Sequence, residues 1–405
     1  MSNCRICRGK LIKIIDLGKI ALVGNFYKVL KKKVKKYKIS LNFCRKCKHV
    51  QIKEILNPNI LFRNYLWETG VSKSNIFLIK NLLFKMKKFG LNKKSKVLEI
   101  ASNDGSFLSI LKDKFKCFTL GVDPAKNFKK KLEKNNIKTV FDFFNLKSSI
   151  KIKKRFNTFS FIFARNVVAH VPNPNEVFKG VFKLLDKYGI FILEVPHLMN
   201  ILRYNQYDNI FHEHIGYHSL KSLIDLSIKN QLKVFDIEEI KSQGGSIRCY
   251  ICKKENSVKV SRKIKLFLLK EKRQGLLSSS KLKSFKNNII NHKKKMQKLL
   301  NKLKKKNRKI SIYGASGKGQ ALMQYCKINN DIIDNVFDKS KLKENCYTPG
   351  TQIKIRNPKM IKSNLINYLL ILSWNIKDEI MRQEKNFKKN GGKFILPFPT
   401  PRIIN

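Results

Sequence analysis

The chain has 405 residues, 42% of them hydrophobic, and a formal net charge of +60. This length and composition are typical of a folded protein with two or three domains, and no apolar run approaches the roughly 20 residues that cross a bilayer. Because the N-terminus also lacks a signal-peptide pattern, we expect a cytoplasmic protein with no membrane partner.

The positive charge has two interpretations. A basic surface attracts phosphate, which would suit a nucleic-acid-binding protein or an anionic small ligand. The lysines, however, are spread along the whole chain and accompany many Ile, Asn and Phe residues, whose codons are AT-rich. Base composition is therefore a sufficient cause, and we expect solvated lysines without a nucleic-acid partner.

Two pairs of cysteines lie near the N-terminus. The pairs are Cys4 with Cys7 and Cys44 with Cys47, each with C-x-x-C spacing, and 36 residues separate them. Each pair lets two thiolates reach one side of a tight turn, and two pairs complete a tetrahedral zinc site. Four thiolates leave no open position, so the predicted zinc is structural; redox or incidental cysteines are the alternative.

A helix is expected over 74–89, and the segment that follows it organises the chain. A strand at 96–100 runs into a small-residue turn and a helix, and a second strand at 118–122 ends in Asp123. This is the start of a doubly wound α/β domain, where such a carboxylate can accept hydrogen bonds from ribose hydroxyls. Glu99, Gly105 and Asp123 together suggest an S-adenosylmethionine site, although any Rossmann-like unit can show one such turn.

Strands at 159–164 and 189–195 extend this pattern to a mostly parallel sheet. His170 follows the first of them, on the side where such sheets bind ligands. The histidine therefore either faces a substrate or is structural.

Residues 211–218 contain three of the seven histidines, beside Glu213. Histidine can take and return a proton near neutral pH, so a general base is favoured. A metal site is the rival interpretation, but the spacing is not H-E-x-x-H, and a structural cluster is a third possibility. Arg248 follows a Gly-Gly turn, which is either a contact to an anionic ligand or a plain hairpin.

A second nucleotide-type turn follows a basic, helical stretch at 259–308. The strand 310–313 leads into Gly314-Ala315-Ser316-Gly317-Lys318-Gly319, and Asp338 ends the next strand. Backbone amides at such a turn suit a diphosphate, to which Lys318 could add a charge. The spacing is not that of a P-loop. Two such turns predict two nucleotide-like ligands; a tight turn without a ligand is the alternative.

Taken together, these segments resemble the deoxysugar C-methyltransferases that act on nucleotide-linked keto sugars. The resemblance covers nearly the whole chain and extends to Pro349-Gly350-Thr351 and Ser373-Trp374-Asn375. It implies an α/β fold with four parts: a zinc-binding domain at 1–60, a class I methyltransferase Rossmann-like domain at 61–258, a basic helical connector at 259–308, and a C-terminal Rossmann-like substrate-binding domain at 309–405.

The resemblance also implies a reaction, in which a base removes the proton beside a ketone and the enolate attacks the methyl group of S-adenosylmethionine. The matching base is His214, and Glu213, His170 and Tyr65 match other active-site positions. The cofactor-binding positions would be Glu99, Ala101, Asn103, Gly105, Asp123 and Arg165. Those for the nucleotide sugar would be His212, Arg248, Gly314, Ser316 and Lys318.

One departure from the family pattern is Phe211, which stands where the family usually has tyrosine. A phenyl ring cannot form the hydrogen bonds of a phenol. Phe211 therefore leaves open a methyltransferase with another acceptor and a sugar-nucleotide-binding protein without catalysis. The cysteine pairs and the excess of lysine leave open a zinc-knuckle nucleic-acid-binding protein.

Overall fold

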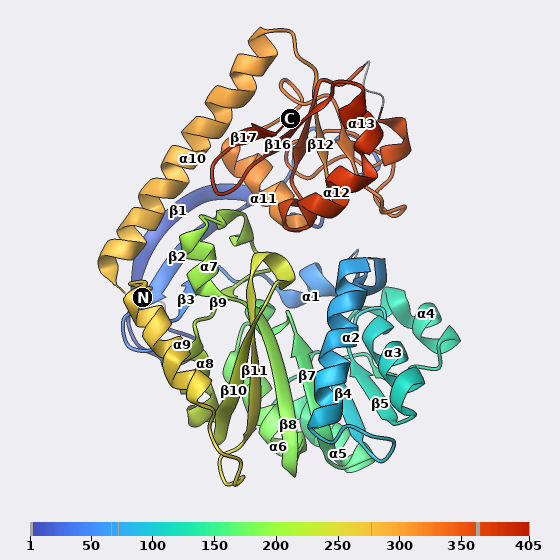
Figure 1. The fold of residues 1–405 in the computed structure, drawn as a ribbon, viewed down its shortest axis with the longest axis vertical. Helices are drawn as coiled ribbons and strands as arrows, with labels where there is room; N and C mark the ends of the chain where they lie inside the picture. The colour runs from blue at the N-terminus through green and yellow to red at the C-terminus, as the bar shows by residue number, and fades with distance from the viewer. Residues whose placement is uncertain (1–2, 66, 72, 277, 362–364, 405) are drawn as a thin grey trace.

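The computed structural model describes all residues except 1–2, 66, 72, 277, 362–364 and 405. The described part of the chain forms three β-sheets, which we call the N-terminal, central and C-terminal sheets (Figure 1). Within that part, no helix combines the length and the apolar character needed to cross a membrane.

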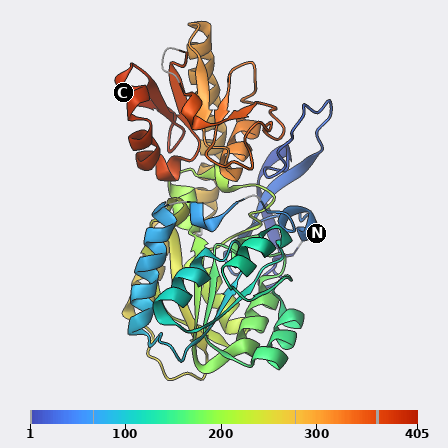
Figure 2. The same ribbon diagram turned by 90° about the vertical axis from the view of Figure 1, so that its right-hand side faces the viewer.

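The N-terminal sheet has four antiparallel strands in the order β1-β2-β3-β9. The strands are β1 (Leu11–Ala21), β2 (Lys36–Cys44), β3 (Val50–Ile52) and β9 (Gly216–Tyr217). The first two make a long ribbon that reaches the C-terminal sheet (Figures 1 and 2). The last strand comes from the middle of the chain, so residues within the predicted range 61–258 complete the N-terminal sheet.

The central sheet has the order β10-β11-β8-β7-β4-β5-β6. Its strands are β4 (Lys96–Ile100), β5 (Phe118–Val122), β6 (Thr139–Val140), β7 (Phe159–Arg165), β8 (Leu185–Pro196), β10 (Leu232–Ile240) and β11 (Ser246–Lys253). The strands from β4 to β8 are parallel, whereas β10 and β11 form an antiparallel hairpin at the edge. The four strands expected from the sequence are confirmed.

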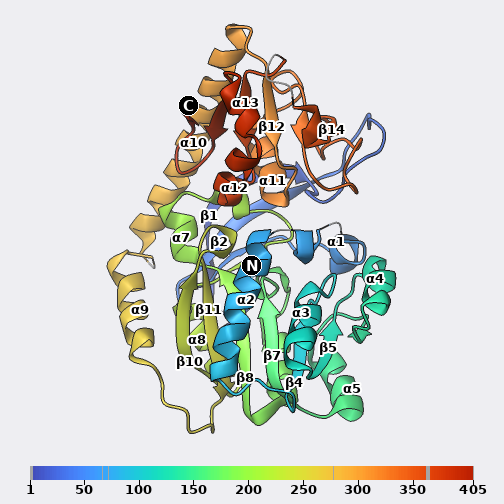
Figure 3. The ribbon, with the colours of Figure 1, turned by 45° about the vertical axis from the view of Figure 1, so that its right-hand side comes forward.

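Helices cover both faces of the central sheet, as a doubly wound fold requires. One face carries α2 (Lys73–Lys88), α3 (Ser106–Phe115) and α4 (Lys129–Lys134) (Figure 3). The other carries α5 (Leu146–Phe156), α6 (Pro174–Leu184) and α8 (Leu220–Lys229). The short helices α1 (Pro58–Phe62) and α7 (Leu198–Arg203) lie at the end of the sheet nearer the C-terminal sheet (Figure 3).

The C-terminal sheet has the order β14-β13-β12-β15-β16-β17 and is parallel except for its last strand. Its strands are β12 (Ile310–Tyr313), β13 (Val336–Phe337), β14 (Ile355–Arg356), β15 (Tyr368–Ile371), β16 (Lys393–Leu396) and β17 (Arg402–Ile404). Its helices are α11 (Gly317–Cys326), α12 (Lys377–Gln383) and α13 (Lys385–Lys389). One apolar core joins this sheet to the ribbon of β1 and β2.

The basic stretch at 259–308 forms two helices, α9 (Arg262–Arg273) and α10 (Ser279–Lys305). The break between them includes Gly275, whose φ of +61° suits glycine. Met296, Leu300 and Leu303 are buried on one face of α10, in the core shared with the C-terminal sheet. Leu299 is partly buried against the same core.

Candidate active site

The loop at 209–217, which we call the histidine loop, holds His212 and His214 and is fixed by hydrogen bonds to its backbone. The Tyr217 hydroxyl donates to the His214 carbonyl at 2.7 Å, and the His214 amide donates to the Phe211 carbonyl at 3.0 Å. The Ile215 amide donates to the Ala169 carbonyl at 2.8 Å. The histidine loop is therefore held against the segment that carries His170.

His214 is in the form that can accept a proton. Its Nδ1 lies 3.1 Å from the Asn209 carbonyl, which can only accept, so Nδ1 carries the hydrogen and the lone pair is on Nε2. Its ring contacts Phe211 and His170, with ring centroids 4.2 and 4.7 Å away. Burial, together with the charges of His170 and Lys318, holds the pKa of His214 well below the ordinary value. The imidazole is thus neutral near pH 7.

Three further candidates surround His214. The Tyr65 hydroxyl donates to Glu213 Oε2 at 3.3 Å. Burial raises the pKa of Glu213 to about 7, against the opposing effect of that hydrogen bond. Burial also lowers the pKa of His170 to about 4. Raised and lowered pKa values in one cluster are typical of catalytic sites.

All four of these residues line a cavity of about 800 Å³, which we call the acceptor cavity. Its walls come from all three sheets. The ribbon contributes the loop 22–26, and the turn before α11 with the first residues of that helix contributes Ala315–Lys318. Residues between 373 and 382, most of them in α12 or just before it, complete the lining. Four basic residues also line it: Lys241, Lys318, Lys343 and Arg382.

A second cavity of about 330 Å³, the donor cavity, adjoins the first. Tyr65, Asn166 and His170 line both. The donor cavity is also lined by four of the predicted cofactor positions: Ala101, Asn103, Asp123 and Arg165. Four predicted donor positions therefore lie on a cavity that shares Tyr65 and His170 with the acceptor cavity.

The turn at the donor cavity follows β4. Ala101, Asn103 and Gly105 all have positive φ, and a Cβ on Gly105 would lie 2.5 Å from Leu132 Cδ2. Asp123 holds the turn, because its Oδ2 accepts from the Asn103 amide at 2.8 Å and its Oδ1 from the Ala125 amide at 2.7 Å. Each oxygen retains a lone pair for a ribose hydroxyl.

Glu99 and Arg165 form an ion pair of 2.6 Å beside this turn. Arg165 lines the donor cavity, whereas Glu99 lies behind it. Burial raises the pKa of Glu99 to about 7, and Arg165 opposes that shift. The second carboxylate oxygen of Glu99, Oε2, has no hydrogen-bond partner among the described residues. On the cavity itself the acceptor is Asp123, whose two oxygens fit a ligand that carries ribose hydroxyls.

The turn at the acceptor cavity follows β12. Gly314 has φ of +98°, and a Cβ there would lie 2.3 Å from Ser373 Oγ, so this glycine shapes the turn without lining the cavity. Ser316 caps α11 by accepting from the Gly319 amide. Lys318 Nζ donates to the Gln243 carbonyl at 2.9 Å, and burial lowers its pKa to about 8.

Besides Gly314, two predicted acceptor residues do not line the cavity. His212 turns away, with Nε2 3.3 Å from the Lys38 carbonyl. Arg248 lies in the hairpin of β10 and β11, where its Nε donates to Glu194 at 2.6 Å and its Nη1 to Glu238. Because two carboxylates occupy its guanidinium, we leave Arg248 out of the proposed acceptor site.

Two lining elements were missed by reasoning from the sequence. Lys343 is buried, with Nζ 3.1 Å from the Ala315 carbonyl and 3.7 Å from Asp338 Oδ2. Nothing local distinguishes it from the other lysines. The loop 22–26 follows an ordinary strand pattern. No signal in its sequence indicates that it lines the same cavity as residues 315–318 of the C-terminal turn.

The four N-terminal cysteines form one cluster. The Sγ atoms of Cys4 and Cys47 are 3.5 Å apart, those of Cys7 and Cys44 are 3.4 Å apart, and all four lie within 4.8 Å of one another. Tetrahedral zinc with bonds near 2.3 Å holds its sulfurs about 3.8 Å apart. The donor set and its spacing therefore fit zinc.

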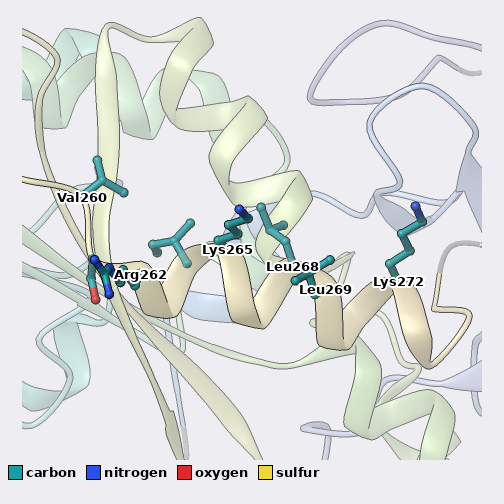
Figure 4. A pocket seen from close by; sticks show the side chains of 8 residues that line it. Val260, Arg262, Lys265, Leu268, Leu269 and Lys272 are labelled. Atoms are coloured by element: carbon teal, nitrogen blue, oxygen red, sulfur yellow. The ribbon is translucent and has the colours of Figure 1, made fainter.

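A further hollow of about 440 Å³ lies along α9 (Figure 4). Its lining is apolar and basic, and includes Val260, Leu268 and Lys272. None of the described residues that line it is a carboxylate, histidine or cysteine, so it lacks the groups for proton transfer.

Comparison with known proteins gives three family models along the chain. "Putative zinc binding domain" matches residues 4–62, "Methyltransferase domain" residues 75–236, and "C-methyltransferase C-terminal domain" residues 241–399. The chain is also 29% identical to C-methyltransferase NovU of Streptomyces niveus, in an alignment that covers 100% of this chain and 97% of that protein.

Solved structures match only the fold of part of the chain. The PH0226 protein of Pyrococcus horikoshii OT3 is 18% identical, with 49% of this chain and 100% of that one covered and a TM-score of 0.36. The cyclopropane synthase MmaA2 of Mycobacterium tuberculosis is 11% identical, with 49% and 92% covered and a TM-score of 0.36. The assignment rests instead on the family models and the full-length relative. The chain is an S-adenosylmethionine-dependent C-methyltransferase with an N-terminal zinc-binding domain.

Proposed function

We propose that this C-methyltransferase acts on a nucleotide-linked keto deoxysugar and that His214 is its base. The observation that carries the proposal is the state and place of His214. Its lone pair is on Nε2, its imidazole is neutral, and it lines the cavity that adjoins the donor cavity. The nucleic-acid alternative would leave these two adjoining cavities without a role.

The nucleotide part of the acceptor is supported by the charge of the cavity. Ser316, Gly317 and Lys318 begin α11, where free backbone amides favour an anion. Lys343 and Arg382 add positive charge on the same cavity. A diphosphate bound there would leave the sugar to extend toward His214.

The residues divide the reaction between them. Bound S-adenosylmethionine would supply a methyl group on a positively charged sulfur, and transfer of that methyl group to the enolate carbon would break the methyl–sulfur bond and leave S-adenosylhomocysteine. His214 Nε2 takes the proton from the carbon beside the ketone, and the electron pair of that bond becomes an enolate. Tyr65, Glu213 and His170 orient the sugar and the base at the junction of the cavities. His214 then releases its proton to solvent.

The test is to incubate the protein with S-adenosylmethionine and a panel of nucleotide-linked keto sugars, and to detect methylated product by mass spectrometry. His214→Ala should lower kcat by about 10²- to 10⁴-fold, the usual contribution of a general base. His212→Ala is the matched control, since that histidine lies two residues away and faces the Lys38 carbonyl. Equal turnover of His214→Ala and the wild type would remove His214 as the base.

Phe211 bears on which acceptor is used. Its ring packs on His214 and offers no hydroxyl to the sugar. We expect the preferred sugar to lack the polar group that would form a hydrogen bond with a tyrosine hydroxyl at position 211. Phe211→Tyr should therefore change the ranking of sugars in the panel, and an identical ranking would contradict this.

A further inference from the structure

The two cysteine pairs begin alike but place their arginines differently. Each has the sequence Cys-Arg-x-Cys, with Arg5 in the first and Arg45 in the second. Arg45 is exposed, whereas Arg5 is half-buried between the N-terminal sheet and the histidine loop. The chain thus contains a natural comparison between two arginines at equivalent positions.

The guanidinium of Arg5 donates to three backbone carbonyls, two of them closely and that of Lys53 at 3.4 Å. Nη1 donates to the Ile215 carbonyl at 2.7 Å, and Nη2 donates to the Ile52 carbonyl at 2.6 Å. The Ile52 amide also donates to the Ile215 carbonyl, at 3.2 Å. Hydrogen bonds from a charged donor are stronger than neutral ones, so Arg5 is a firm contact to Ile215.

Ile215 directly follows His214, and its peptide groups are held from two sides. Its amide donates to the Ala169 carbonyl, next to His170, while its carbonyl accepts from Arg5. Strand β9 begins at the next residue and pairs with β3 of the N-terminal sheet. The backbone around His214 is therefore fixed between the segment that carries His170 and the first cysteine pair.

We propose that Arg5 is a positioning residue, which sets the place of His214 relative to His170 and links the cysteine cluster to the acceptor cavity. The inference rests on the proposed role of His214 as the base. Arg5 touches neither cavity and takes no part in proton transfer. Its effect on His214 is transmitted by the hydrogen bond to the Ile215 carbonyl.

Other contacts hold the first cysteine pair without the side chain of Arg5. Asn175 Nδ2 donates to the Arg5 carbonyl at 2.8 Å, and Lys229 Nζ donates to the Ile6 carbonyl at 2.8 Å. Both use backbone oxygens, which every substitution of Arg5 retains. An Arg5→Ala variant should therefore keep its fold and its zinc.

The experiment compares Arg5→Ala, Arg5→Lys and the control Arg45→Ala. Zinc content, melting temperature and affinity for S-adenosylhomocysteine should match the wild type in all three. In Arg5→Ala, kcat should fall about 10- to 100-fold with little change in the KM of the sugar, as expected for a base displaced by about 1 Å. Arg5→Lys, which can reach one carbonyl, should recover part of kcat.

Hydrogen exchange gives a readout that needs no substrate. Amides in 209–218 should exchange faster in Arg5→Ala than in Arg45→Ala, while those in 97–123 stay unchanged. The proposal is overturned if Arg5→Ala matches Arg45→Ala in exchange or in kcat. It is also overturned if both Arg5 variants lose zinc or donor affinity together with activity. A wild-type chain that methylates no keto sugar would overturn the proposed function instead, and exchange would still test Arg5.

Discussion

The two strand-turn-helix units of this protein have the same local structure. In each, a carboxylate at the end of the second strand accepts from an amide of the turn, at 2.8 Å for Asp123 and 2.7 Å for Asp338. In each, the other oxygen accepts from the amide two residues further on, at 2.7 and 2.9 Å. The sequences of the two turns are quite different, so this geometry does not by itself select a ligand.

The neighbours of each carboxylate differ. Asp123 forms no ion pair with the described residues, and apolar side chains such as Phe143 and Phe144 lie with it on the donor cavity. Asp338 pairs with Lys343, whose ammonium also lies on the larger acceptor cavity. We infer that the first turn suits the hydroxyls of a nucleoside and the second suits a phosphate-bearing ligand. The side chains around each turn, and not the geometry of the turn itself, determine which ligand the turn suits.

Removal of zinc should produce the largest difference between the two sites: loss of function at the acceptor cavity with ligand binding retained at the donor cavity. The acceptor cavity needs the loop 22–26 and strand β9, which depend on the sheet that carries the cysteines, whereas the donor turn lies within the central sheet. Without metal, four clustered thiolates repel one another. Chelation should abolish methyl transfer while calorimetry still detects S-adenosylhomocysteine binding, and added zinc should restore transfer. Equal loss of both would contradict the separation.

The two carboxylates offer a matched pair of substitutions. Asp123→Asn should weaken S-adenosylhomocysteine binding about 100-fold, because charge-assisted hydrogen bonds of about 1.5–3 kcal/mol each are lost. Asp338→Asn should leave that affinity unchanged and act only on the sugar nucleotide. Calorimetry on both variants checks this. If both substitutions weakened donor binding alike, the inferred division of ligands would be wrong.

Lys343→Met tests the phosphate preference of the second turn. Loss of one buried cation should raise the KM of the nucleotide sugar about tenfold, equivalent to about 1.4 kcal/mol, with donor affinity unchanged. Lys341→Met is the control, because Lys341 is exposed two residues away. Steady-state kinetics at two salt concentrations should show a weaker salt dependence only in Lys343→Met.

The smallest expected effect is on thermal stability as a function of pH. It concerns two buried carboxyl groups whose pKa is raised to about 7, Glu99 and Glu213. A raised pKa means that each group stabilises the fold fully below its ordinary value of 4.5 and loses that contribution as the pH rises through 7. Glu213→Gln should therefore unfold at a higher temperature than the wild type above pH 7, and similarly at pH 4.5.

Glu99→Gln is the contrast, because it leaves Arg165 without its charged partner. This variant should be less stable than the wild type at pH 7. Thermal melts across pH 4.5–8 compare the two. A gain in stability for Glu99→Gln at pH 7 would contradict the role of its ion pair.

Much of this protein could be predicted from its sequence. The strand from Lys96 to Ile100, the glycine at 105 and the acid at 123 were recognisable because burial and a tight turn leave marks within a few residues. The four cysteines were recognisable for the same reason, since metal ligands in close pairs have a fixed spacing.

Only the tertiary structure decided which charged side chains meet at the cavities. Arg248 appeared suited to a ligand but is paired with Glu194, whereas Lys343, one lysine among many, reaches the acceptor cavity. Likewise, no local pattern placed Arg5 on Ile215, because 210 residues separate them. The hydrophobic periodicity of a segment indicates which face of that helix or strand is buried. The partner of a charged side chain depends instead on packing between elements that are distant in sequence, and the local pattern does not contain that information.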